Sequence, residues 1–538
     1  MNVFLLGLDG MTLRIVEPYI KAGLLPSFQK VMNNGSYGVL HSTIPPSSPL
    51  AWTSLATGKN PGKHGIYEFR KRNGYTTEII TKSISPYANP MWNVLSRHGK
   101  KVVIANVPFF YPPDKVNGIM VSGLMTPSLN AEFVYPNEEK KKILELIPNY
   151  QVDIGADEYV YSTDMNLLLK KIFEITEGRR NLMEYMLENH PWNLFFLVFT
   201  GPDRLQHFLW DEVTSMDREC VKYYQLLDEI LGNILKRFDD ETVLFIVSDH
   251  GFMEAKKSFY INTFLKESGL LEPRHNYKIK NSLAKLNISV ANIRRTIKKT
   301  GWAQLKKHVP TPLINLVRRT FPSEGLKEGD FVHRKTKAFS LQSYGIISVN
   351  LKGREPKGIV ERADYHNLCE VIINELLKVE DPETGKSIVK TVYKGELIYS
   401  NEYSKDRPDL LVIMNEGYSI NQSLGTVIVG ENRVGNKYRT GDHDEKGLFI
   451  AHGNSIIRER IVADIYDIMP TILYLMGAAI PEDVDGQVLT EIINPEFVKN
   501  HEIQFENNIH YNSSKGSALN GEETKKIENL LKNLGYMD

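Results

Sequence analysis

The stretch VFLLGLDG, residues 3–10, joins a run of apolar residues to an acidic residue directly behind it. The run has no polar alternation, which is typical of a strand covered on both faces in a parallel sheet. Four further segments share this composition: KVVIANV (101–107), NLFFLVF (193–199), TVLFIVS (242–248) and GLFIA (447–451). Amphipathic helical patterns lie between them, at 138–147, 165–190 and 218–238. The alternation predicts an α/β sandwich with a mostly parallel central sheet.

The rest of the chain divides by composition. Its 538 residues exceed what one simple core needs. Segment 273–319 has twelve Lys or Arg, no Asp or Glu, and apolar residues at near-helical spacing. We expect a catalytic core in two parts (1–253 and 431–495), a basic helical insertion that forms a lid (254–330), a smaller cap and return segment (331–430), and a linker with a C-terminal helix (496–538).

Charge and cysteine content exclude several classes of protein. The formal net charge is zero, so we expect no nucleic-acid partner. The two cysteines, Cys220 and Cys369, lie far apart, which excludes a disulfide framework and a thiolate zinc site. The chain shows no signal peptide and no apolar stretch of membrane-spanning length, so we expect a cytoplasmic location. Nothing in the sequence indicates an oligomeric state.

Acidic residues and histidines follow the predicted strands. Asp9 follows the first strand, the pair Asp249 and His250 follows the strand at 242–248, and Asp203 and His207 follow the strand at 193–199. Ligands bind beyond the carboxyl ends of strands in open α/β sheets. Each residue alone is more often a helix cap or a turn residue than a ligand. The argument rests on their joint occurrence with His443, in GDHDEKG (441–447), and with the hydroxyl-rich segment at 47–57.

This set of side chains suits two divalent cations. Asp and His are ligands for zinc or manganese, and two such ions clamp the oxygens of an in-line displacement at phosphorus. A hydroxyl beside one ion loses its proton more easily and can attack without a histidine base. This would explain why no G-x-S-x-G motif surrounds the serines. We expect two divalent ions, with zinc ahead of manganese.

The motifs together resemble the alkaline phosphatase superfamily, in particular its type I phosphodiesterase/nucleotide pyrophosphatase family. The resemblance covers nearly the whole chain. It is carried by LLGLDGM (5–11), PPSSPLAWTSLATGKNPGKHGIYEF (45–69), NVPFFYPP (106–113), FTGPDRLQHFLW (199–210), VSDHGF (247–252), GDHDEKGLFIAHG (441–453) and LKNLGY (531–536). It implies an alkaline-phosphatase-like three-layer sandwich.

The resemblance also implies roles for single residues. The family nucleophile lies ten positions before the Gly of the TG pair, and counting back from Gly58 gives Ser48. One ion would be held by Asp9, Ser48, Asp249 and His250, and the other by Asp203, His207 and His443. His64 is similar to a family histidine that is structural. Phe69 stands where many family members have a phosphate-binding Asn, so the donors to phosphate would be main-chain N–H groups or the basic residues Arg70, Lys71 and Arg72.

The sequence thus predicts a metal-dependent hydrolase of phosphodiester or pyrophosphate bonds with a covalent phosphoseryl intermediate on Ser48. Within the superfamily, a phosphomonoesterase or a phosphonate hydrolase is the alternative. The substrate would be a small molecule or a lipid- or glycan-linked phosphodiester, and segment 273–319 could add a peripheral membrane contact. The alternative from another class is a non-catalytic protein that binds a polyanion or a membrane surface.

Overall fold

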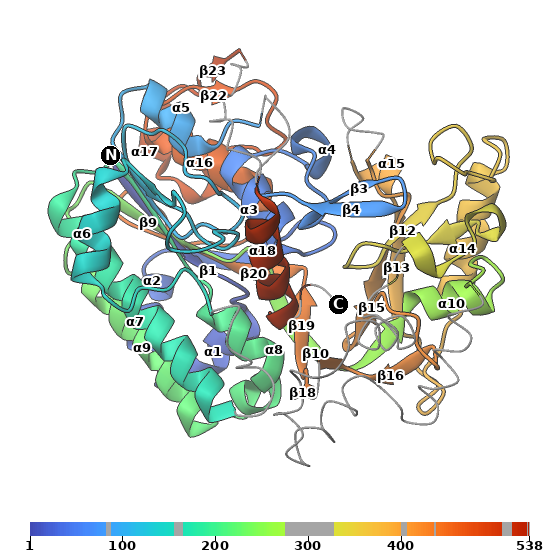
Figure 1. Cartoon of the computed structure of the whole chain (residues 1–538). Coiled ribbons are helices and arrows are strands. Elements are labelled where there is room, and N and C mark those ends of the chain that lie inside the picture. The colour runs from blue at the N-terminus through green and yellow to red at the C-terminus, as the bar shows by residue number, and fades with distance from the viewer. Residues whose placement is uncertain are drawn as a thin grey trace.

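The computed structural model describes residues 1–81, 88–154, 165–274, 326, 328–399, 406–434, 437–507, 519–534 and 536. The predicted basic helical insertion lies outside the described residues from 275 to 325. Figure 1 shows two lobes, a larger α/β lobe and a smaller, strand-rich lobe.

A nine-stranded sheet forms the centre of the larger lobe. Strand β1 (Asn2–Leu8) lies between β8 (Leu194–Phe199) and β9 (Thr242–Val247) and is parallel to both. The order is β21-β2-β20-β9-β1-β8-β5-β6-β7. The outer strands are β5 (Val102–Ala105), β6 (Gly118–Val121), β7 (Val134–Tyr135), β20 (Lys446–His452), β2 (Ser36–His41) and β21 (Arg460–Asp464). The predicted α/β sandwich with a mostly parallel sheet is confirmed.

All five predicted strands are present, but the prediction that GLFIA (447–451) is a parallel strand is wrong. Strand β20 runs antiparallel to both β9 and β2. His443, only three residues before β20, lies at the edge of the sheet where β1 and β9 end. The strand therefore begins at this edge and runs away from it, against the direction of β9.

Helices cover both faces of the sheet (Figure 1). Phe4, Leu6 and Leu8 of β1 join one buried cluster, whereas Val3 and Leu5 join another. The first face is covered by α1 (Leu13–Lys21), α2 (Pro26–Asn33), α6 (Glu138–Leu146), α7 (Met165–Asn189), α8 (Gly201–Thr214), α9 (Arg218–Leu235) and α18 (Gly521–Asn533). The opposite face is covered by α3 (Ser48–Thr57), α5 (Met91–Arg97) and α16 (Ile468–Leu475). The alternation of side chains along β1 thus produces the three layers.

The smaller lobe has its own core around an antiparallel sheet in the order β11-β12-β14-β13. These strands are β11 (Ala338–Phe339), β12 (Ile346–Val349), β14 (Leu410–Met414) and β13 (Val389–Lys394). Its helices are α10 (Ile261–Glu267), α14 (Tyr365–Leu377) and α15 (Gly395–Ile398).

Strand β10 (Gly251–Tyr260) begins directly after His250 and carries the chain toward this lobe. It pairs with β15 (Gly417–Asn421), β16 (Val429–Glu431) and β19 (Gly441–Asp444). The boundary expected at residue 254 therefore falls inside a strand. The remaining short elements are α4 (Pro61–His64), α17 (Pro495–Asn500), the hairpin β3 (Arg70–Asn73) and β4 (Thr76–Ile79), β17 (Arg433–Val434), β18 (Lys437–Tyr438), β22 (Ile480–Pro481) and β23 (Phe505–Glu506).

The register of the parallel strands aligns their carboxyl ends. Leu8 lies opposite Phe199, and Gly7 lies opposite Val247. The residues that follow β1, β8 and β9 therefore meet at one edge of the sheet. No helix in the described part of the chain combines the length and apolar content that a membrane span requires.

Candidate metal centre

Three buried aspartates share one arrangement. A protein donor forms a hydrogen bond to one carboxylate oxygen, and the other oxygen points toward a histidine ring. For Asp9, the Trp52 indole donates to Oδ2 at 3.3 Å. For Asp249, the Gly10 main-chain N–H donates to Oδ1 at 3.1 Å. For Asp203, Arg204 binds Oδ2, while Oδ1 lies 3.1 Å from the Nε2 of His443. Each carboxylate is thus oriented with one oxygen available to a ligand.

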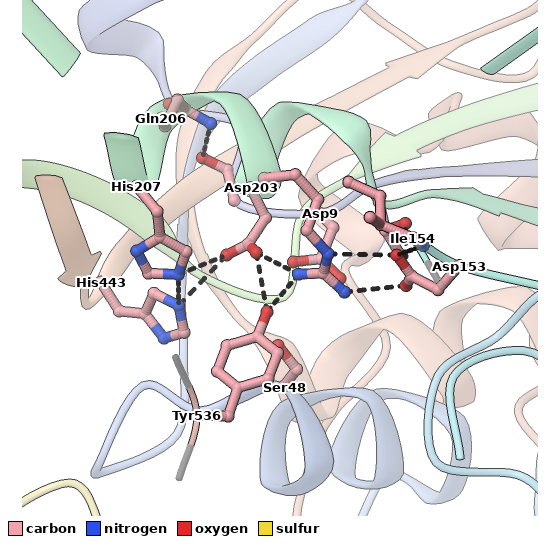
Figure 2. Close-up of polar contacts among 12 residues, drawn as sticks. Asp9, Ser48, Asp153, Ile154, Asp203, Gln206, His207, His443 and Tyr536 are labelled. Atoms are coloured by element: carbon pink, nitrogen blue, oxygen red, sulfur yellow. Dashed lines mark hydrogen bonds and ion pairs between the residues drawn. The ribbon is translucent and has the colours of Figure 1, made fainter. Parts of the chain in front are cut away.

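Three histidines are oriented in a similar way, with one ring nitrogen beside a main-chain carbonyl and the other beside an aspartate. In His443 and His250 the Nδ1–H group donates to the carbonyls of Pro46 (2.9 Å) and Gly251 (3.1 Å), whereas the Nδ1 of His207 lies beside both the Gly441 carbonyl (3.2 Å) and the guanidinium of Arg439. A carbonyl only accepts, so in His443 and His250 Nδ1 carries the proton and Nε2 keeps its lone pair. In His207 the guanidinium of Arg439, which only donates, competes with the Gly441 carbonyl for Nδ1. The Nε2 atoms of His207 and His443 face Asp203 (Figure 2), and the Nε2 of His250 lies 3.2 Å from Asp249. This is how histidines that bind a metal are usually oriented.

Two groups of ligand atoms result. In the first, Asp203 Oδ1 and the Nε2 atoms of His207 and His443 lie 3.1–3.2 Å from one another. Ligands about 3.3 Å apart surround a tetrahedral ion with bonds of about 2.0 Å. In the second, the Nε2 of His250 lies 3.2 Å from Asp249 Oδ2 and 3.7 Å from Asp9 Oδ1. The rings of His250 and His443 stack with centroids 3.6 Å apart, so the two groups are adjacent.

Ser48 lies beside the second group. It is the first residue of α3, and its Oγ is 3.3 Å from the Nε2 of His250. The other hydroxyls of this helix are engaged elsewhere: Thr53 and Thr57 donate to main-chain carbonyls of the helix, and Ser54 bonds to the Nε2 of His64 at 3.0 Å. Of the candidate hydroxyls on α3, Ser48 is the one that the structure brings to the carboxylates.

The pKa values of the buried side chains favour a bound cation at this centre. Burial, with the charges of Asp249 and Asp203 acting in the same direction, raises the pKa of Asp9 well above its usual range. Burial and the charge of Asp203 raise the pKa of Asp249 to about 7. Burial and the neighbouring Arg439 lower the pKa of His207 to about 4. The metal-free centre therefore disfavours the ionised forms of Asp9 and Asp249, and a bound cation would favour them.

Unpaired atoms support the same conclusion. Among the described residues, Asp9 Oδ1 and Asp249 Oδ2 are buried and have no hydrogen-bond partner. The Nε2 atoms of His207 and His443 lie 3.1 Å apart, with a carboxylate oxygen beside both. Such an arrangement is stable when a cation lies between the atoms. The residues present therefore fit divalent ions in both groups.

The three basic residues expected near the phosphate are each paired with a carboxylate. Arg72 binds Glu355 of the smaller lobe at 2.8 Å, and both side chains are buried. Lys71 lies 3.2 Å from Asp406, and the Nε of Arg70 lies 3.2 Å from Glu68. These partners hold the hairpin β3–β4. His64 bonds to Ser54 and accepts from the Ile66 N–H at 3.2 Å, and neither contact involves the six-residue centre.

Sequence reasoning missed several residues around the centre. Trp52 and Arg204 hold the aspartates, and Arg439 contacts His207. Asp442 forms a third candidate group with His207 and His443, and its place directly before His443 in GDHDEKG was an available signal. Tyr536 donates to Asp203 Oδ2 at 2.7 Å from the far end of the chain, and no local pattern indicates this contact.

A cavity of about 280 Å³ opens beside His443 between the two lobes. From the larger lobe its wall includes Pro45, Pro46 and Asp442; from the smaller lobe it includes Tyr344, Met414 and Ile420. Tyr536 also lines it, whereas Phe69 is buried beneath Tyr536 and stacks on its ring. The candidate centre thus faces a pocket that could hold a small molecule.

Comparisons with known proteins identify a family and a similar fold. The sequence model of the type I phosphodiesterase / nucleotide pyrophosphatase family matches residues 3–444. The fold is similar to phosphonoacetate hydrolase from Sinorhizobium meliloti 1021 in complex with phosphonoacetate, with a TM-score of 0.53 and 14% identity over 89% of this chain and 95% of that one. Murine ectonucleotide pyrophosphatase / phosphodiesterase 5 matches with a TM-score of 0.48 and 13% identity over 92% of this chain and 100% of that one. None of the curated proteins matches the sequence significantly.

The match of the family model over residues 3–444 defines the class of protein, a hydrolase. The chain belongs to the type I phosphodiesterase / nucleotide pyrophosphatase family, so the predicted family is confirmed, and it is an enzyme of the phosphoric ester hydrolase type.

Proposed function

We propose that the chain hydrolyses a phosphodiester or pyrophosphate bond with Ser48 as nucleophile. The observation that carries this proposal is the set of three aspartates and three histidines whose free ligand atoms converge beside the Ser48 hydroxyl. Two divalent ions, zinc before manganese, would be held by Asp9, Asp249, His250 and Ser48 and by Asp203, His207 and His443. When bound, they would supply positive charge that lowers the pKa of the Ser48 hydroxyl and offsets charge on the phosphate.

The remaining steps use the chain's own residues. Ser48 Oγ forms a bond to phosphorus while the opposite P–O bond breaks and the leaving oxygen keeps the electron pair. Water then cleaves the phosphoseryl ester and restores the Ser48 hydroxyl. Ser48 begins α3, and no described side chain caps this helix, so its first N–H groups and the positive end of its dipole favour an anion here. They can take the role expected of Arg70, Lys71 or Arg72.

The cavity supports a small-molecule substrate. It is shared by both lobes, so the cap contributes to the choice of substrate. Its volume of about 280 Å³ suits a small phosphoester or the head group of a lipid- or glycan-linked phosphodiester. A phosphomonoester or a phosphonate would meet the same candidate metal centre, so the test must compare these bond types directly.

The experiment is a substrate panel on zinc- or manganese-loaded protein. It compares bis- and mono-nitrophenyl phosphate, a dinucleotide, a glycerophosphodiester and phosphonoacetate. We expect the diesters or pyrophosphates to give the highest kcat/KM and Ser48→Ala to abolish turnover. Ser54→Ala removes a buried hydroxyl from the same helix and should keep turnover per folded molecule. Robust hydrolysis by Ser48→Ala would contradict the proposed nucleophile.

A further inference from the structure

The C-terminal segment returns to the candidate metal centre. Helix α18 lies against the larger lobe, near the junction with the smaller one (Figure 1), and Ile527, Leu530 and Leu531 join the core on the first face of the sheet. Tyr536, two residues beyond Leu534, is only 3% exposed. It lies outside residues 3–444, which the family model matches. The contact therefore joins the last sequence motif, LKNLGY (531–536), to the candidate metal centre from beyond the region that the family model matches.

Three contacts fix the position of Tyr536. Its ring stacks on Phe69 with centroids 5.2 Å apart and an angle of 26°. Its carbonyl accepts from the Ser343 hydroxyl of the smaller lobe at 3.1 Å. Its phenol oxygen donates to Asp203 Oδ2 at 2.7 Å and accepts from Arg204 (Figure 2). Both lobes thus hold this residue in one place.

Arg204 is held in turn. Its Nε and Nη2 donate to the two oxygens of the buried Asp153 at 3.2 and 2.8 Å. Its Nη1 donates to both Asp203 Oδ2 and the Tyr536 oxygen. The phenol therefore has an acceptor and a donor, and Asp203 Oδ2 has two donors. Such charge-assisted bonds are stronger than neutral ones, and they restrict rotation of the carboxylate.

The consequence concerns the other oxygen of Asp203. With Oδ2 held by Arg204 and Tyr536, Oδ1 stays 3.1 Å from the Nε2 of His443 and 3.2 Å from that of His207. Partners that orient a metal ligand tune metal affinity. We infer that Tyr536 is a positioning residue, which holds Asp203 in its ligating orientation, and that the cation group formed with His207 and His443 is incomplete without the C-terminus. This inference rests on the proposed function.

The test is zinc affinity of the full-length protein without substrate. Metal-free wild type, Tyr536→Phe and Tyr474→Phe are titrated with zinc against a chromophoric chelator. Tyr536→Phe keeps the ring on Phe69 and removes only the hydroxyl. Tyr474→Phe removes a partly buried hydrogen bond, from the hydroxyl to the His501 carbonyl at 2.7 Å, on the opposite face of the sheet. We expect Tyr536→Phe to weaken one of two zinc sites by about 10- to 100-fold, and the control to bind like wild type.

Two further readouts separate positioning from a general structural effect. Turnover of Tyr536→Phe should fall at limiting zinc and recover at excess zinc, because the ligands remain. Deleting residues 535–538 should weaken the same site further. Zinc affinity unchanged in Tyr536→Phe, or turnover above wild type, would overturn the inference while leaving the proposed centre intact. Wild type that binds neither zinc nor manganese would overturn the proposed function and this inference together.

Discussion

Replacing Asp249 by Asn should stabilise the metal-free protein at neutral and alkaline pH, although it removes a proposed metal ligand. Asp249 is fully buried, and burial together with the charge of Asp203 raises its pKa to about 7. A carboxyl with a raised pKa in the folded state stabilises the fold fully below its unfolded value of about 3.9 and loses this contribution as pH rises through about 7.

The magnitude follows from the pKa. From pH 5 to the folded pKa, the penalty grows by about 1.4 kcal/mol per pH unit, so it increases by about 3 kcal/mol between pH 5 and pH 8. The amide that Asp249→Asn introduces cannot ionise, and its oxygen can still accept from the Gly10 N–H, as Asp249 Oδ1 does. The free energy of unfolding of Asp249→Asn, relative to wild type, should therefore rise by about 3 kcal/mol over this range.

The assay is urea unfolding of both proteins in chelator at pH 5, 6, 7 and 8. The difference between the two proteins cancels the titration of distant groups. With zinc present the sign should reverse at pH 8, because the wild type binds the ion more tightly than the variant. A difference between the metal-free proteins that is constant with pH would refute the view that Asp249 carries an uncompensated buried charge.

Three further substitutions test how the surroundings support the centre. Arg72→Ala removes the buried partner of Glu355 Oε2 and leaves only Arg354 on the other oxygen, so it should lower the free energy of unfolding by about 3 kcal/mol, with no rise in KM. A raised KM at unchanged stability would show that Arg72 binds substrate. Gly7→Ala places a Cβ 2.7 Å from the Trp52 ring and should lower the free energy of unfolding by about 1–3 kcal/mol, as measured in urea. An unchanged free energy of unfolding would mean that this ring can move freely. The Asp228 carboxylate accepts two main-chain N–H groups at the start of α2, so Asp228→Ala should lower the free energy of unfolding by about 1–2 kcal/mol without changing zinc affinity. Weaker zinc binding would contradict the view that Asp228 acts on stability alone.

The six aspartates and histidines could be placed from sequence because local order determines their position. Asp9 and Asp249 directly follow buried strands, and the parallel register brings those strand ends together. His443 was found through its motif, but the direction of β20 behind it was not, because an apolar run carries no information on whether it lies parallel or antiparallel to its neighbours.

Contacts between distant segments could not be predicted. Tyr536 and Asp203 are separated by 333 positions, and neither neighbourhood indicates the other. The basic run 70–72 was expected near phosphate because its charge was visible, whereas its partners Asp406 and Glu355 come from the smaller lobe. A sequence shows which groups need a partner, but tertiary packing decides which partner they obtain.

The stereochemistry at phosphorus tests the central claim most directly. A chiral phosphorothioate diester is hydrolysed by the zinc-loaded enzyme in isotopically labelled water, and the configuration of the product is determined. Attack by Ser48 followed by attack of water comprises two in-line displacements, so the account predicts net retention. Net inversion would mean that water attacks phosphorus directly, and it would contradict the role of Ser48 as nucleophile.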